Sequence, residues 1–122
     1  MRIPITHCLS WPQRLTSGAK RLSLTEIGKL TFFSPDIERF KCLPLAYEAL
    51  SLGKAAPAVL NASNEIVVQS FLNKEMSFIR IPAIIEKVLQ KFYDLSAATL
   101  QEILWADKLA REQTVRLIQA SS

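Results

Sequence analysis

The sequence predicts a mainly α-helical protein, a small four-helix bundle preceded by an irregular linker with two short β-strands. The bundle is predicted because apolar residues recur at helical spacing from Arg39 onward, and because prolines and glycines stand where helices open and close. The linker is predicted because the earlier part of the chain places apolar residues between turn-forming ones. We therefore expect a first region at residues 1–38 and a helical domain at residues 39–122.

The first region is expected to be mostly irregular up to about Ser34. A short apolar turn from Pro4 to Trp11 leads into a connector from Trp11 to Gly18, whose Pro, Thr, Ser and Gly residues interrupt helices. Two alternations of apolar and polar residues follow, Leu22 to Leu24 and Leu30 to Phe32. Alternation of this kind is typical of strands, so two short strands or a loose hairpin are predicted there.

The first bundle helix is predicted around Leu43 to Leu50. Pro44 suits the first turn of a helix, where its missing N–H would be unpaired anyway. Gly53 is placed to end the helix, because glycine adopts the left-handed conformation of a C-terminal cap without strain.

Three further helices complete the predicted bundle. The second begins near Ala56 or Pro57, the third is opened by Pro82, and the fourth starts after Ser96, a good N-cap residue. Short turns between such helices favour an antiparallel bundle. The residues predicted to face inward are Leu60, Asn64, Val67, Val68, Phe71 and Leu72 in the second helix, Ile84, Ile85, Val88, Leu89 and Phe92 in the third, and Leu100, Ile103, Leu104, Ala110, Leu117 and Ile118 in the fourth.

The composition is that of one ordinary globular domain, with 122 residues of which 49% are hydrophobic and 21% charged. The net charge of +4 is scattered, and its longest basic run is Lys20–Arg21, which argues against a nucleic-acid-binding protein. No apolar run approaches the roughly 18 residues of a membrane span, and no signal peptide is evident, so we expect a cytoplasmic protein that does not bind membranes. Cys8 and Cys42 should be reduced, with Cys42 packed as a small hydrophobe.

Few residues are candidates for chemistry. Asn61, Asn64 and Glu65 share a helix face, where they either bind a ligand or metal or tie the preceding Ala55–Pro57 loop to the bundle by hydrogen bonds. His7 and Cys8 are adjacent, but neighbouring helical residues point about 100 degrees apart, so a catalytic pair is not expected. Clustered metal ligands and a glycine-rich phosphate loop are also missing from the pattern.

One further pair of charged residues is predicted to be structural. Asp107 and Arg111 have the i, i+4 spacing of an ion pair on a helix surface. No catalytic residue and no metal ligand is therefore assigned in this chain.

Several motifs together point to a known family. Lys29 to Glu65 reads KLTFFSPDIERFKCLPLAYEALSLGKAAPAVLNASNE, Met1 to Ile5 and Trp11 to Arg14 read M-R-x-P-I and W-P-x-R, and Asp107 to Arg111 reads D-x-x-A-R. This pattern resembles the C-terminal part of the 1-deoxy-D-xylulose 5-phosphate reductoisomerase family, with Ser63 in place of the second alanine of that family's L-N-A-A-N-E. The resemblance spans nearly the whole chain but only the last third or so of such an enzyme.

The resemblance implies an oxidoreductase and isomerase that depends on NADPH and a divalent cation, Mg or Mn. Such enzymes convert 1-deoxy-D-xylulose 5-phosphate to 2-C-methyl-D-erythritol 4-phosphate in isoprenoid precursor synthesis. Residues 1–38 would be the end of the catalytic domain and a linker, and residues 39–122 the C-terminal helical domain. Met1 matches the position that packs near the nicotinamide ring, so it is the one candidate cofactor contact.

The same resemblance sets expectations for the isolated chain. The cofactor and catalytic domains would lie upstream, so the chain alone should be inactive and should bind neither NADPH nor a metal ion. Its partners would be the upstream domains of the same enzyme, and exposed apolar residues should favour a homo-oligomer. The alternative is a freestanding helical protein-interaction module; the strand-like Leu22–Phe33 region favours the enzyme, because such a module has little use for it.

Overall fold

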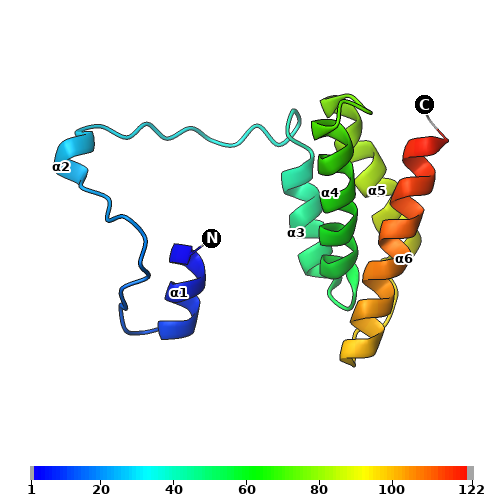
Figure 1. Cartoon of the computed structure of the whole chain (residues 1–122), viewed down its shortest axis with the longest axis horizontal. Coiled ribbons are helices and arrows are strands. Elements are labelled where there is room, and N and C mark those ends of the chain that lie inside the picture. Colours follow the sequence, from blue (N-terminus) through cyan, green and yellow to red (C-terminus); the bar gives the residue numbers. More distant parts are fainter. Residues whose placement is uncertain (1, 121–122) are drawn as a thin grey trace. The chain divides into compact units, whose positions relative to one another are not determined.

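The computed structural model describes residues 2–120, which form two compact units, one within the first 34 residues and one from Pro35 onward. Figure 1 labels their elements. The first unit contains α1 (Arg2–Ser10) and the single turn α2 (Leu24–Ile27). The second contains four long helices. The predicted domain boundary after residue 38 remains a prediction.

The helix α1 corrects the prediction of a short apolar turn from Pro4 to Trp11. Pro4 stands in the first helical turn, where a proline removes no intrahelical hydrogen bond. None of the residues of α1 is buried within its unit. A helix therefore forms where the proline suggested only a turn.

The two short strands predicted between Leu22 and Phe33 are wrong, since residues 2–120 contain no strand. Ser23 instead caps the helical turn α2, its hydroxyl accepting a hydrogen bond of 3.4 Å from the backbone N–H of Glu26. Gly28 ends that turn with φ of +71°. The Leu30 to Phe32 segment is irregular because a strand needs a partner for its backbone groups, and the described residues supply none.

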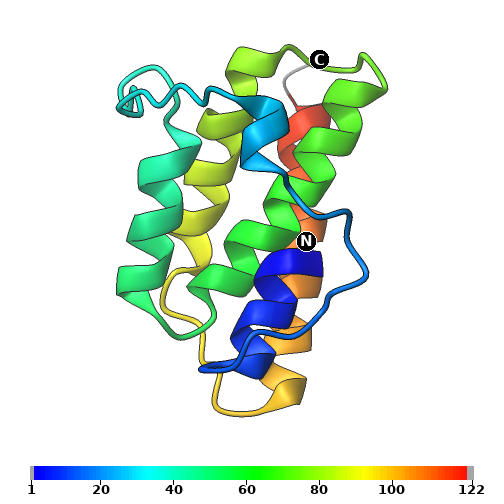
Figure 2. The same ribbon diagram turned by 90° about the vertical axis from the view of Figure 1, so that its left-hand side faces the viewer.

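The second unit confirms the predicted mainly α-helical bundle. Its four helices are α3 (Cys42–Leu52), α4 (Ala56–Leu72), α5 (Ile81–Phe92) and α6 (Leu100–Gln119), with the short 3₁₀ turn η1 (Phe78–Arg80) before α5. They run side by side in Figures 1 and 2, and α4 contacts each of the other three. The bundle is therefore organised around α4.

The predicted helix ends are confirmed for three helices and wrong for one. Pro57 and Pro82 lie in the first turns of α4 and α5, and Gly53 ends α3 with φ of +65° while its N–H bonds to the carbonyl of Ala49. The cap of α6 is Thr99 rather than Ser96. Thr99 has the better position because Glu102, three residues later, completes a capping box with it.

The core is made of aliphatic side chains and alanines. The inward-facing residues predicted for α5 are confirmed, with Ile84, Ile85, Val88 and Leu89 buried and Phe92 packed against them. The stripe predicted for α4 is confirmed only in part: Val67 is buried and Leu60 packs against the core, whereas Val68, Phe71 and Leu72 are exposed. The buried residues of α4 are Ala56, Val59, Ala62, Ser63, Val67 and Ser70. Small side chains bring helix axes closer together, so α4 turns its small residues inward.

The predicted inward face of α6 is confirmed only in its later half. Ala110 and Ile118 are buried and Leu117 is half-buried, whereas Leu100 and Leu104 are exposed. Ala106 and Thr114 complete the buried face. Within residues 2–120, no helix combines the length and the apolar character needed to cross a membrane.

Candidate functional site

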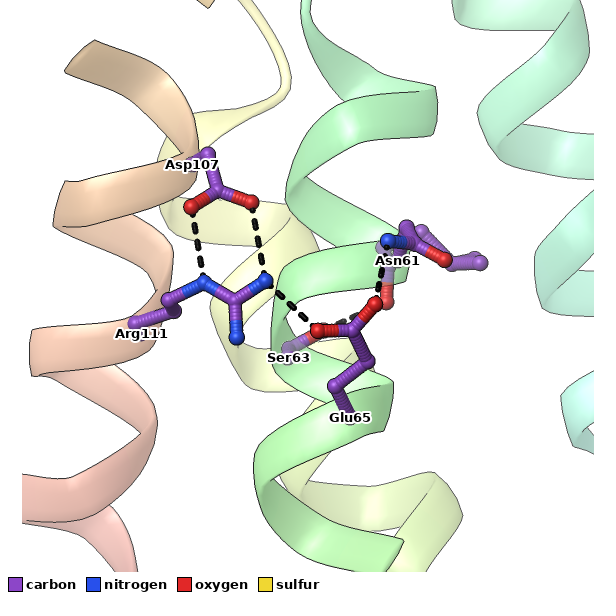
Figure 3. Close-up of polar contacts among 6 residues, drawn as sticks. Asn61, Ser63, Glu65, Asp107 and Arg111 are labelled. Atoms are coloured by element: carbon purple, nitrogen blue, oxygen red, sulfur yellow. Dashed lines mark hydrogen bonds and ion pairs between the residues drawn. The ribbon is translucent and has the colours of Figure 1, made fainter. Parts of the chain in front are cut away.

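The most connected polar site links α4 to α6 through Arg111. Its guanidinium donates to Asp107 from Nε over 2.7 Å, and one terminal nitrogen donates to Glu65 over 2.6 Å. Figure 3 shows Arg111 between the two carboxylates. Asn61 adds a hydrogen bond of 3.0 Å from Nδ2 to Glu65, on the preceding turn of α4. We call Asn61, Glu65, Asp107 and Arg111 the interhelical ion cluster.

Hydrogen bonds in this cluster favour the charged forms of Glu65 and Arg111. The hydrogen bond from Arg111 lowers the pKa of Glu65, and the bond from Asn61 adds to the effect. Hydrogen bonds to Asp107 and then to Glu65 raise the pKa of Arg111. One cation thus serves two carboxylates, an arrangement suited to joining two helices rather than to exchanging protons.

The structural role predicted for these residues is confirmed in part. The Asp107–Arg111 ion pair is present, and Asn61 and Glu65 share a helix face as expected. The predicted tie to the Ala55–Pro57 loop is wrong, because Asn61 bonds forward to Glu65 and the loop is held instead by the Ala55 N–H, which donates to the carbonyl of Leu95. Sequence reasoning also missed that Glu65 reaches Arg111, since residues 46 positions apart give no local signal.

Ser63 shows how a hydroxyl is accommodated on the inner face of α4. The residue is fully buried, and its hydroxyl donates a hydrogen bond of 3.0 Å to the carbonyl of Leu60. A buried hydroxyl without a partner would be destabilising. The packing therefore absorbs the serine, as predicted from the sequence.

An apolar groove lies beside the start of α3. Its volume is about 220 Å³, and its walls come from the segment before α3, from α4 and from the start of α5. The residues that line it are Arg39, Phe40, Lys41, Cys42, Asn64, Val68, Phe78, Ile81 and Pro82. Cys42 corrects the prediction of a buried thiol: the residue is exposed at this groove, because it begins α3 at the rim of the bundle. Partial burial there raises the pKa of the Cys42 thiol.

A second hollow, lined by both polar and apolar side chains, lies within the N-terminal unit. It has a volume of about 260 Å³. One face of α1 supplies four of its lining residues, and the loop after α1 supplies three. They are Ile3, Thr6, His7 and Ser10 from α1, and Arg14, Leu15 and Ser17 from the loop. We call this hollow the N-terminal pocket.

His7 and Cys8 are both exposed on α1, and no hydrogen bond joins them within residues 2–120. The His7 ring instead packs edge-on against Trp11, with ring centroids 5.4 Å apart. The described residues also include no group of three or more His, Cys, Asp or Glu side chains placed to hold a metal ion. Met1, the candidate nicotinamide contact, lies outside the described residues.

The fold and these sites define a small helical-bundle domain with a separate N-terminal helical unit. The family model for the DXP reductoisomerase C-terminal domain matches residues 1–113, so the chain belongs to this family. The resemblance stated from the sequence motifs is confirmed.

Curated relatives agree with this assignment. The chain is 50% identical over 117 residues to the 1-deoxy-D-xylulose 5-phosphate reductoisomerase of Prosthecochloris aestuarii, a match that covers 96% of the chain and 31% of the relative. It is also 50% identical over 112 residues to the enzyme of Nitrosospira multiformis, covering 92% of the chain and 28% of the relative. The chain thus spans less than a third of the length of these relatives.

Solved structures give the same result. The reductoisomerase of Zymomonas mobilis in complex with NADPH superposes with a TM-score of 0.77 and 40% identity, covering 95% of the chain and 31% of that structure. A DOX-P reductoisomerase in complex with magnesium gives a TM-score of 0.76 at 34% identity, covering 98% of the chain and 32% of that structure. The fold described above is therefore the fold of this family's C-terminal region.

Proposed function

We propose that this chain is the C-terminal part of an NADPH- and divalent-metal-dependent reductoisomerase that converts 1-deoxy-D-xylulose 5-phosphate to 2-C-methyl-D-erythritol 4-phosphate. The observation that carries the proposal is the continuous family match over residues 1–113, which includes both the N-terminal unit and most of the bundle. In this proposal the bundle is a structural support, and NADPH, Mg or Mn and the substrate are bound mainly by upstream domains. The enzyme would act in the cytoplasm.

The ion cluster and the core support this role for the bundle. The charged side chains of the cluster are used in joining α4 to α6, and the apolar side chains of α5 are used in the core. The chain alone is proposed to be inactive, and Met1 to contact the nicotinamide only when the upstream domains hold it. Saturable binding of NADPH by the chain alone would contradict this last point.

A chimera tests the proposal. The part of the Prosthecochloris aestuarii enzyme upstream of the matched region is fused to this chain, and consumption of NADPH is followed with 1-deoxy-D-xylulose 5-phosphate and Mg²⁺ or Mn²⁺. The chimera should be active, whereas the chain alone and the upstream part alone should not. A chimera that is folded by circular dichroism but inactive would contradict the proposal.

The alternative is a freestanding helical interaction module. The observation in its favour is that residues 35–122 form a compact unit with its own core. The chimera distinguishes the two functions, because a module that has diverged from the enzyme would not restore its activity. An active chimera would therefore exclude divergence of this kind.

A further inference from the structure

The N-terminal pocket collects hydrogen-bond donors along one face of α1. Ile3, Thr6, His7 and Ser10 follow the i, i+3, i+4, i+7 spacing of a single helix face, and all four line the pocket. Arg14 and Ser17 reach the same hollow from the loop that follows the helix. Positions on a rigid helix and on an adjoining loop therefore surround one volume.

Several of these donors have no partner in the described part of the chain. Arg14 makes no ion pair within residues 2–120, and Thr6 makes no side-chain hydrogen bond there. Ser17 accepts a bond of 3.3 Å from the N–H of Ala19, which leaves its hydroxyl hydrogen free to donate. Ser10 differs, because its hydroxyl already donates to the carbonyl of Gln13 over 2.9 Å. The guanidinium and two hydroxyls are thus available to an acceptor.

The net positive charge of the chain is concentrated in the N-terminal segment that contains this pocket. Residues 1–34 contain five cationic side chains, and Glu26 is their only carboxylate. This segment therefore carries +4, which is the net charge of the whole chain, and residues 35–122 are neutral overall. No carboxylate lines the pocket, so nothing there repels an anion or neutralises Arg14. The cationic side chains of the segment are Arg2, Arg14, Lys20, Arg21 and Lys29.

We propose that the N-terminal pocket binds a phosphate dianion, either inorganic phosphate or the phosphate of a small monoester. The planar fork of Arg14 can donate two parallel hydrogen bonds to phosphate oxygens, and hydroxyl donors from Thr6 and Ser17 suit the remaining oxygens of a tetrahedral group. The edge-on contact with Trp11 orients the His7 ring at the side of the pocket. The inference goes beyond the proposed function and rests on the pocket alone.

The size of the pocket limits the ligand. Its volume of about 260 Å³ lies just below the ~300 Å³ at which drug-sized binding sites begin. A phosphate or a small sugar phosphate fits such a volume, whereas a dinucleotide does not. The pocket is therefore assigned to a small phosphate rather than to NADPH.

Nuclear magnetic resonance of the 122-residue chain tests the site, because His7 is the sole histidine and its ring signals are unambiguous. Inorganic phosphate is titrated at fixed pH and ionic strength, and the His7 ring signals should shift saturably. Arg14→Gln should weaken the binding at least tenfold, and Arg14→Lys should weaken it less. Arg21→Gln removes the same charge outside the pocket and should leave binding within about twofold, since only screened long-range attraction is lost.

Further titrations distinguish inorganic phosphate from a phosphate monoester as the ligand, and they define the results that would overturn the proposal. A lower dissociation constant for 1-deoxy-D-xylulose 5-phosphate than for inorganic phosphate, with no shift from 1-deoxy-D-xylulose, identifies a monoester site; equal constants identify a site for the phosphate group alone. An absent or non-saturating shift overturns the proposal. An equal loss in Arg14→Gln and Arg21→Gln also overturns it, as does tighter binding of NADPH than of phosphate. Activity of the chimera is read separately, so either result stands without the other.

Discussion

Arg111 on α6 donates a hydrogen bond of 2.6 Å to Glu65 on α4, and it holds Asp107 on its own helix at the same time. The guanidinium therefore joins two helices through residues that lie 46 positions apart in the sequence. Side chains of the cluster are about one third to one half exposed, so water screens their attraction. The bridge should fix the register of α4 against α6 more than it adds to stability.

Replacing Arg111 measures this bridge. Arg111→Met keeps most of the apolar stem and should lower the free energy of unfolding by about 1 kcal/mol or less, the range of exposed ion-pair networks. Urea unfolding followed by circular dichroism gives the value. Arg116→Met on the same helix, where the side chain makes no ion pair within residues 2–120, is the control and should change stability less. Equal losses in the two variants would mean that the bridge has no stabilising role.

The stability of the bundle should fall in acid because of two carboxylates. Hydrogen bonds from Arg111 and Asn61 lower the pKa of Glu65, and hydrogen bonds from the backbone of Thr99 and the hydroxyl of Ser96 lower the pKa of Glu102, both from a usual value of 4.5. A pKa that is lower in the folded state gives stability that is complete above the unfolded value. That stability is then lost as the pH falls from about 4.5 through the lowered values.

Glu102→Gln isolates one of these contributions. The amide cannot ionise, so the variant should lose less stability than the unmodified chain when urea unfolding is compared at neutral pH and at pH values below 4.5. Glu112→Gln, where the carboxylate makes no hydrogen bond within residues 2–120, is the matched control. Parallel pH profiles for the Glu102→Gln variant and the unmodified chain would contradict the assignment.

The N-cap of α6 can be tested at two neighbouring hydroxyls. Thr99→Ala removes the acceptor for the Glu102 N–H and should cost about 0.5–2 kcal/mol of stability. Ser96→Ala removes only a hydroxyl that donates to the Glu102 side chain and should cost less. A larger loss of stability in Ser96→Ala than in Thr99→Ala, measured by thermal or urea unfolding, would show that Ser96 is the effective cap.

Some helix boundaries could be predicted because the residues that set them act locally. Pro57, Pro82 and Gly53 mark helix ends through their own backbone chemistry, so three helix boundaries could be predicted from the residues alone. The inward face of α4 could not, because Ala62 and Ser63 are buried through close approach to other helices, and apolar periodicity favours larger side chains such as Leu72.

The polar sites also include one that could be predicted from local spacing and others that could not. The Asp107–Arg111 pair was predictable because both residues lie on one helix, four positions apart. The link to Glu65 and the N-terminal pocket both depend on how separate segments meet, and the sequence carries no spacing rule for the contact between Glu65 and Arg111. The spacing of Thr6, His7 and Ser10 was a usable signal, but it was masked by the interpretation of Pro4 to Trp11 as a turn.

Leu89 should be among the residues on which the bundle depends most. Its side chain on α5 is only 2% exposed, within a core that α3, α4 and α6 also line. Leu89→Ala removes buried methylene and methyl groups and leaves a cavity, which should cost about 2–5 kcal/mol. Leu104→Ala is the matched control. Because Leu104 is 59% exposed, this variant should lose much less free energy of unfolding when it is measured in urea. Comparable losses of stability in the two variants would contradict the prediction, because they would mean that Leu104 is as buried as Leu89.

Self-association is expected from the apolar side chains of the N-terminal unit. Phe32 and Phe33 are 84% and 87% exposed on a segment without regular structure, and adjacent exposed aromatic residues favour contact with another molecule. Light scattering should give a mass above that of one chain, rising with concentration. The double variant Phe32→Ser and Phe33→Ser should lower this mass, because it removes the apolar surface without touching the bundle core.

Ile79→Ser, at a residue that is 82% exposed in η1, should leave the mass unchanged if the N-terminal unit is responsible. A mass of one chain at every concentration would contradict the prediction. A decrease in mass in the Ile79→Ser variant alone would mean that the bundle, and not the N-terminal unit, makes the contact.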